Sequence, residues 1–240
     1  MIARSLTEIA AIVGGRLTGG DAGVVTSVVI DSREVVSGGL FVAISGEQVD
    51  GANFIPAAFE RGAVAALTSV EGDGARILVE DPRTALSRLA AHVRAHSRAT
   101  VVAITGSVGK TLTKDLTAAA VATQRRTVAT PGNFNNELGV PLTICRLEEE
   151  TQVLVAEVGA RGIGHIASLM PMLAPDVSVV LNVGDAHIGE FGDLEATARA
   201  KRELVEGLAP GGVAILNADD ERVRAMRASA PSCLLFGTGK

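Results

Sequence analysis

One short segment carries the residue types of a phosphate-binding loop. AITGSVGKTLTKD, residues 103–115, contains Gly-Lys-Thr but lacks the first glycine usual in such loops. Gly106 and Gly109 would let backbone N–H groups face phosphate oxygens, and a helix N-terminus would add positive potential. Lys110 would reach the β- and γ-phosphates, and the Thr111 hydroxyl could bind Mg²⁺. Because a buried strand precedes the segment and a helix follows it, a nucleotide site is favoured over a glycine turn with a solvated lysine.

Two further polar residues follow apolar runs of strand length. Glu157 ends QVLVAE, where a carboxylate could bind Mg²⁺ beside a phosphate loop or be a solvated strand end. His187 follows DVSVVLNV and could bind a metal, although a polar loop residue is the simpler interpretation. His92 and His96, four apart on a predicted helix, are interpreted as solvated surface residues.

The remaining candidates look structural when each is taken alone. Lys201 lies in an amphipathic helix and resembles an ordinary exposed lysine. Asn217 ends a strand, and Asp219 and Asp220 are predicted to cap the next helix. The asparagines of TPGNFNNELGVPL, residues 130–142, could satisfy local backbone groups or line a polar pocket.

A third polar stretch, DSREVVSGG, leaves two interpretations open. Asp31, Ser32 and Arg33 could form a simple Asx turn. An arginine beside a hydroxyl, with glycines nearby, could equally hold a phosphate or a uracil edge. The residues alone do not choose between them.

Composition excludes several classes of protein. Hydrophobic residues make up 47% of the 240 residues, enough for real cores, and charged residues at 20% exclude a disordered chain. The net charge of −5 and the six Phe, with no Trp or Tyr, argue against an oligonucleotide binder. No apolar run is long enough for a spanning helix, and the N-terminus lacks a signal peptide's apolar core. The two cysteines have no metal or disulfide spacing. We therefore expect a cytoplasmic protein.

These residues must be positioned by alternating strands and helices. The aliphatic composition predicts an α/β protein: a small mixed α/β domain over 1–97 and a domain with a mostly parallel sheet over 98–240, which contains the predicted nucleotide loop. Ligands of such sheets bind beyond the carboxyl ends of the strands. The predicted strands cover residues 24–30, 39–44, 63–69, 75–81, 100–105, 152–158, 176–183 and 211–218. The predicted helices begin near Ser5 and cover 53–61, 84–98, 110–124, 163–170 and 194–208.

Taken together, seven segments in order resemble the ATP-dependent Mur ligases of peptidoglycan synthesis. They are DSREVVSGGLFVAISGEQVDGANFI, ITGSVGKTLTKD, TPGNFNNELGVPLT, AEVGARGIGHIASL, LNVGDAHIGEFGD, ARAKRELVEGL and LNADD. The resemblance covers nearly the whole chain, and the missing first glycine is itself a feature of this family. Two departures are Val108, where a small polar residue is usual, and His165, where many members carry an acidic residue. We expect neither to change the chemistry.

The resemblance implies roles for individual residues. Thr111 and Glu157 would bind one Mg²⁺, and His187 would help hold a second. Lys201 matches a lysine that CO₂ carbamylates, giving an anion that supports the second Mg²⁺. The implied catalytic residues are Lys110, Glu157, His187 and Lys201. Ser32 and Arg33 would hold the uridine end of the substrate. The implied ATP-binding residues are Thr105, Gly106, Ser107, Val108, Gly109, Lys110, Thr111, Asn136 and Asn217.

The implied reaction joins D-Ala-D-Ala to UDP-N-acetylmuramoyl-tripeptide at the expense of ATP, through an acyl phosphate. The alternatives are a sister ligase that adds the third peptide residue, and a nucleotide-binding or regulatory relative that never ligates. We expect a monomer with no nucleic-acid partner. The resemblance also implies a third domain beyond Lys240, so we expect an inactive fragment of a longer ligase.

Overall fold

The chain forms two compact units. The computed structural model describes residues 1–21, 23–46, 49–184 and 193–239. The first unit contains Met1–Ser97 and Ile144–Glu149, and the second contains Arg98–Thr143 and Glu150–Lys240. Sequence periodicity gave no sign that 144–149 returns to the first unit. There the Ile2 N–H donates to the Leu147 carbonyl at 3.1 Å.

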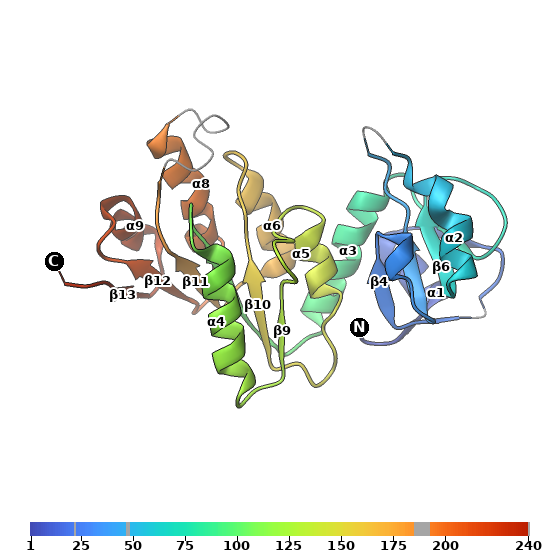
Figure 1. Cartoon of the computed structure of the whole chain (residues 1–240), viewed down its shortest axis with the longest axis horizontal. Coiled ribbons are helices and arrows are strands. Elements are labelled where there is room, and N and C mark those ends of the chain that lie inside the picture. Colours follow the sequence, from blue (N-terminus) through green and yellow to red (C-terminus); the bar gives the residue numbers. More distant parts are fainter. Residues whose placement is uncertain (22, 47–48, 185–192, 240) are drawn as a thin grey trace. The chain divides into compact units, whose positions relative to one another are not determined.

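The first unit is built on a five-stranded sheet in the order β2-β7-β6-β5-β4, in which only β2 runs antiparallel to its neighbour (Figure 1). The short strands β1 and β3 pair separately. The strands are β1 (Arg4–Ser5), β2 (Arg16–Thr18), β3 (Val24–Val25), β4 (Ser27–Val29), β5 (Gly39–Val42), β6 (Ala63–Thr68) and β7 (Arg76–Leu78). The helices are α1 (Leu6–Val13), α2 (Ile55–Glu60) and α3 (Pro82–Ala95), with short 3₁₀ turns at Ser32–Glu34 and Gly51–Phe54.

Local chemistry explains where these elements begin and end. The capping box predicted before α1 is confirmed, because Ser5 and Glu8 each accept from the other's backbone N–H. The single strand predicted over 24–30 is wrong: it is two strands, β3 and β4, which belong to different sheets. The break falls at Thr26, whose backbone N–H donates to the Gly38 carbonyl instead of a sheet partner.

The second unit alternates strands and helices. Its strands are β8 (Thr100–Thr105), β9 (Thr127–Ala129), β10 (Val153–Glu157), β11 (Val177–Val180), β12 (Val213–Asn217) and β13 (Cys233–Phe236). Its helices are α4 (Lys110–Ala122), α5 (Gly139–Ile144), α6 (His165–Leu173), α8 (Leu194–Glu206) and α9 (Glu221–Ala225), with a 3₁₀ turn at Met226–Ser229. The strands β9 and β13 were not predicted, because both are short: β9 has three residues, and the apolar run of β13 has four.

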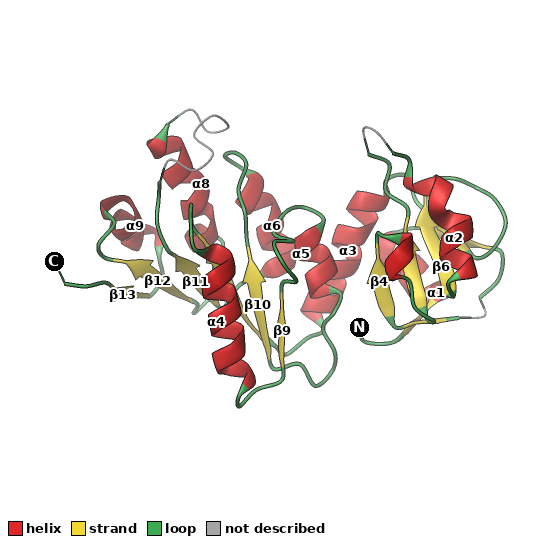
Figure 2. Cartoon of the chain, in the orientation of Figure 1, coloured by secondary structure: helices red, strands yellow, loops and turns green. Residues whose placement is uncertain are grey.

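The six strands pair in parallel in the order β13-β12-β11-β8-β10-β9, which confirms the predicted parallel sheet. In the view of Figure 1, α4 lies in front of this sheet. Figure 2 shows the helices in red and the strands in yellow. The chain runs from β8 to one side through β9 and β10, then crosses to β11 on the other side. The strand order therefore reverses at the carboxyl end of β8, and in sheets of this kind ligands bind at such a reversal.

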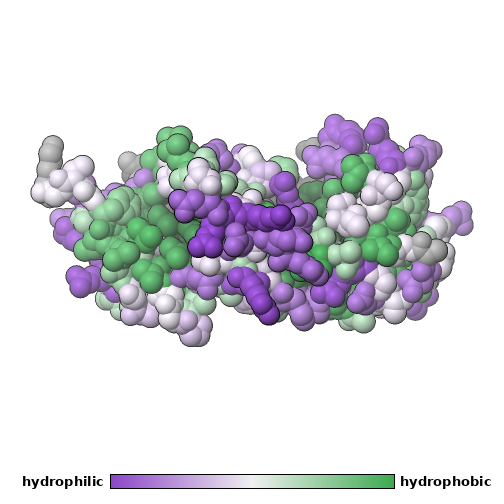
Figure 3. Space-filling view, turned by 90° about the horizontal axis from the view of Figure 1, so that it is seen from below, coloured by the Kyte–Doolittle hydropathy of each residue, from purple (hydrophilic) through white to green (hydrophobic). Residues whose placement is uncertain are grey.

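The cores are mostly aliphatic, as the composition predicts, although Phe41 is buried in the first unit. Val101, Ala103 and Ile104 of β8 are fully buried, as are Leu154 and Val155 of β10. Hydrophobic surface gathers at the C-terminal end of the second unit in Figure 3, and the exposed apolar side chains of β13 belong to that end. Among the described residues, no helix combines the length and the apolar character needed to cross a membrane.

Candidate nucleotide and metal site

The glycine-rich loop joins β8 to α4 with the geometry that a phosphate loop needs. Gly109 precedes the helix with φ 82°, a left-handed conformation that favours glycine. Gly106 packs against β11's end, where an added Cβ would lie 3.0 Å from Leu181 Cβ. The Lys110 ammonium donates back to the carbonyls of Gly106 at 2.8 Å and Ser107 at 3.3 Å. The carbonyls of the loop therefore hold the Lys110 ammonium group in place.

Two of the loop's N–H groups are already bonded to Asn182. The Ser107 N–H donates to the Asn182 carbonyl at 3.1 Å, and the Val108 N–H donates to Asn182 Oδ1 at 2.9 Å. The first N–H to bond back along α4 is that of Thr113. The N–H groups of residues 110–112 consequently have no partner among the described residues. They are the donors that a helix N-terminus offers to an anion.

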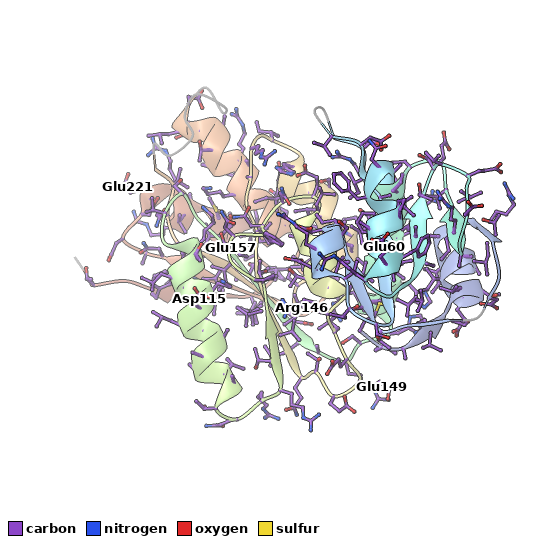
Figure 4. The ribbon with its side chains drawn as sticks, turned by 45° about the vertical axis from the view of Figure 1, so that its right-hand side comes forward. Glu60, Asp115, Arg146, Glu149, Glu157 and Glu221 are labelled. Atoms are coloured by element: carbon purple, nitrogen blue, oxygen red, sulfur yellow. The ribbon has the colours of Figure 1, made fainter. Side chains whose placement is uncertain are left out.

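Glu157 lies at the carboxyl end of β10, beside β8, and is labelled in Figure 4. Its side chain is 1% exposed. Asn135 Nδ2 donates to Oε1 at 2.7 Å, whereas Oε2 is buried without a hydrogen-bond partner among the described residues. Burial lowers the pKa of Lys110 and the nearby Glu157 carboxylate opposes that effect, so the two groups interact. A buried carboxylate oxygen without a partner is a strong candidate for a cation ligand.

The donor set fits a magnesium ion that arrives with a nucleotide. Within the described part of the chain, no three His, Cys, Asp or Glu side chains converge as a metal cage. Mg²⁺ needs no such cage, because it is usually held by one or two carboxylates together with substrate phosphates and water. Glu157 supplies the carboxylate, and the exposed Thr111 stands on the first turn of α4.

Lys201 is buried, so its interpretation as an exposed surface lysine is wrong. Its side chain on α8 is 4% exposed. Burial, with a smaller effect from the Lys110 charge, lowers the pKa of Lys201 from 10.5 to about 8. A substantial fraction of this amine is therefore neutral near pH 8.

The other predicted nucleotide contacts make local hydrogen bonds. Asn136 Oδ1 accepts from the N–H groups of Leu138 and Gly139, at the start of α5. Asn217 Nδ2 donates to the Leu181 carbonyl at 2.9 Å, which ties the ends of β12 and β11 together. His187 lies outside the described residues. The roles of all three toward a ligand stay predictions.

Polar residues near these positions have structural partners. Asp220 caps α9 as predicted, and its second oxygen accepts from the Val183 N–H at 2.7 Å. Asp219 instead accepts from Thr238. His165 Nδ1 accepts from the Arg161 N–H, and Nε2 lies 3.2 Å from Glu137.

In the first unit, the Asx turn at Asp31 is present. Asp31 accepts from the Arg33 N–H and pairs with its guanidinium at 2.6 Å. These contacts lower the pKa of Asp31 to about 2. Ser32 is buried, whereas the Arg33 side chain is 82% exposed. The turn does not exclude the substrate interpretation, which stays a prediction.

Sequence reasoning missed four residues that support the site: Lys114, Thr130, Asn135 and Asn182. None lies in a recognisable motif position, and each bonds to a partner that is distant in the sequence. The asparagine-rich turn before α5 was the one available signal, and there a pocket and a backbone role were left as alternatives.

Comparison with known protein families matches this architecture. Residues 104–240 match the Mur ligase middle domain, and residues 24–94 match the Mur ligase family catalytic domain. The chain belongs to the Mur ligase family. The resemblance predicted from the seven segments is thereby confirmed.

Individual Mur ligases are similar along most of the chain. The UDP-N-acetylmuramoyl-tripeptide–D-alanyl-D-alanine ligase of Mycobacterium leprae is 41% identical over 94% of this chain. A crystal structure of MurF from Acinetobacter baumannii has a TM-score of 0.89 and 32% identity, covering 98% of this chain and 53% of that one. MurF from Thermotoga maritima in complex with ADP has a TM-score of 0.79 and 35% identity, covering 89% and 51%. The chain spans about half the length of the curated relatives it matches.

Proposed function

We propose that this chain supplies the ATP-binding and UDP-substrate-binding parts of a ligase that joins D-Ala-D-Ala to UDP-N-acetylmuramoyl-tripeptide. The observation that carries the proposal is the buried Oε2 of Glu157, which has no hydrogen-bond partner among the described residues. Glu157 also interacts with the charge of Lys110, the first residue of α4. The names and the roughly 40% identity of the relatives support the choice of substrates.

The chain's own residues are suited to bringing two anions together. A substrate carboxylate attacks the γ-phosphate of ATP, ADP leaves, and an acyl phosphate forms; an amine then displaces phosphate to make the amide. Lys110 and the N–H groups of residues 110–112 would hold the phosphates and offset their charge. Glu157 and Thr111 would hold Mg²⁺, which supplies further neutralisation of charge at the transferred phosphoryl group.

Lys201 has the properties that carbamylation requires. Only a neutral amine attacks CO₂, and the depressed pKa provides that form. From the neutral amine, the reaction forms one N–C bond and releases one proton. Counted from the ammonium form, two protons are released, and a buried cation that interacts with Lys110 becomes an anion. This change would remove the unfavourable interaction between two ammonium groups. With His187, the carbamate would help hold a second Mg²⁺.

An assay of the full-length protein tests the ligase activity. Phosphate release is measured with ATP, each of the two UDP-muramoyl precursors, and either D-Ala-D-Ala or the amino acid added third. We expect turnover only with the tripeptide precursor and D-Ala-D-Ala. Turnover with the dipeptide precursor would favour the sister ligase, and no turnover with any pair would favour a non-ligating relative.

The same assay with the 240-residue chain tests whether the further domain is needed. We expect weak nucleotide binding and little or no dipeptide-dependent phosphate release, because the relatives are twice as long. Robust turnover would contradict that expectation.

A further inference from the structure

The carboxylate of Glu157 is held in one orientation by a neutral donor. Asn135 Nδ2 donates to Oε1 at 2.7 Å, and the Glu157 backbone N–H donates to Thr130 Oγ1 at 3.0 Å. An amide fixes the carboxylate without cancelling its charge, whereas a lysine or arginine in that place would compete with a cation. Oε2 therefore keeps its full capacity as a ligand.

Residues 130–135, the segment that carries Asn135, form backbone hydrogen bonds with β10 and with the residues just after it. The Thr130 N–H donates to the Val155 carbonyl at 3.0 Å, and the Gly159 N–H donates to the Asn135 carbonyl at 2.8 Å. Gly159 also makes room for the amide, because an added Cβ would lie 2.7 Å from Asn135 Oδ1. Asn135 is thus fixed by both its backbone and its surroundings.

Lys114 ties this segment to the helix that carries the phosphate loop. Its side chain on α4 is 2% exposed, and Nζ donates to the carbonyls of Thr130 at 2.9 Å and Gly132 at 3.2 Å. Asp115, labelled on α4 in Figure 4, completes its partners at 2.6 Å. A buried ammonium is costly unless it is fully bonded, so these contacts fix the spacing between α4 and the segment.

We propose that Asn135 is a positioning residue for Glu157, aiming Oε2 at the divalent cation, and that Lys114 holds the segment that carries Asn135. The proposal rests on the proposed function in one respect, the role of Glu157 as a ligand of nucleotide-bound Mg²⁺. Partners that orient metal ligands commonly contribute about 10- to 100-fold to metal affinity.

Calorimetric titration of the 240-residue chain with ADP, in EDTA and in saturating Mg²⁺, measures this effect without turnover. We call the ratio of ADP affinity in saturating Mg²⁺ to ADP affinity in EDTA the Mg²⁺ gain. For Asn135→Ala we expect ADP affinity in EDTA within about twofold of wild type, while the Mg²⁺ gain falls about 10- to 100-fold. Asn133→Ala is the matched control: it lies in the same segment, is exposed, and should keep the full gain. A full gain in Asn135→Ala would overturn the proposal.

Glu157→Gln separates this proposal from the function on which it rests. Loss of the Mg²⁺ gain in Glu157→Gln but not in Asn135→Ala would refute the positioning role alone. An unchanged gain in Glu157→Gln would instead refute the metal role in the proposed function.

Two further variants test the support. Gly159→Ala should displace the Asn135 amide and so reduce the Mg²⁺ gain, while the side chains of Asn135 and Glu157 stay chemically unchanged. Lys114→Met keeps the length of the side chain and should also reduce the gain, with folding checked by circular dichroism. A folded Lys114→Met with the wild-type gain would overturn the role of Lys114, and the Asn135 test stands even if that variant unfolds.

Discussion

Asn182 exchanges two hydrogen bonds with the backbone of Val108. Val108 N–H donates to Asn182 Oδ1 at 2.9 Å, and Asn182 Nδ2 donates to the Val108 carbonyl at 3.1 Å. Next to it, Ser107 Oγ donates to the Gly184 carbonyl and accepts from the Gly184 N–H. The phosphate loop is therefore attached to residues 182–184, which follow β11, and the 63% exposed Val108 side chain takes no part in this contact.

Asn182→Ala should loosen the loop. We expect the free energy of unfolding to fall by about 1–2 kcal/mol, because two backbone groups lose their partner, and ADP affinity to fall with it. Chemical denaturation and calorimetry of the 240-residue chain measure the two effects. Val108→Ala keeps the backbone contact and should change stability by less than about 0.5 kcal/mol. Equal damage from both variants would contradict this account.

Lys201 should make stability depend on alkaline pH. The unfolded chain keeps this proton up to about pH 10.5, whereas the folded chain releases it near pH 8, so the free energy of unfolding should rise between those values. Lys201→Met should remove that rise and stabilise the chain at pH 7 by roughly 3 kcal/mol. Denaturation series in buffers free of CO₂ measure this, and identical pH profiles for the two proteins would count against a buried amine.

Lys201→Ala should also abolish ligation by the full-length protein, and added bicarbonate should not restore it. The physical reason is that alanine has no amine to carry a carbamate. Labelling with ¹³CO₂ provides an independent readout, since the wild-type protein should show a carbamate carbon signal that the variant lacks. A fully active variant would return Lys201 to a structural role.

Glu203 on α8 should stabilise the start of α6, which is distant from it in the sequence but adjacent in the fold. Its carboxylate on α8 accepts from the N–H groups of Gly164 at 2.5 Å and Ala167 at 2.9 Å. Glu203→Ala should lower the free energy of unfolding by about 1–2 kcal/mol, as the loss of a helix cap does. Glu206→Ala, an exposed change on the same helix, is the control and should have little effect. Similar losses in both variants would rule out the cap.

Arg33→Ala tests the two interpretations of the turn at Asp31. The Arg33 side chain is mostly exposed and, among the described residues, pairs with the nearby Asp31, so its removal should change stability little. If it also holds the uridine end of the substrate, UDP binding to the 240-residue chain, followed by ligand-observed NMR, should weaken clearly. Unchanged UDP binding would leave the Asx turn as its only role.

The local pattern predicted the parts of the site that are continuous in the sequence. The predicted start of α4 at Lys110 is confirmed, and so are the placement of Glu157 at the end of a parallel strand and the cap at Asp220. Each depends on residues within a few positions of one another, where periodicity, capping and turn chemistry act. The family, too, follows from short motifs in order.

Only the tertiary structure decided which oxygen of Glu157 lacks a partner in the described part of the chain, that Lys201 is buried, and that Asn182 holds the phosphate loop. These properties come from contacts between residues 22 to 74 positions apart, or from burial by several elements at once. An isolated lysine or asparagine has the same appearance in a sequence whether it is solvated or enclosed. Packing alone sets its partners, and with them its charge and its chemistry.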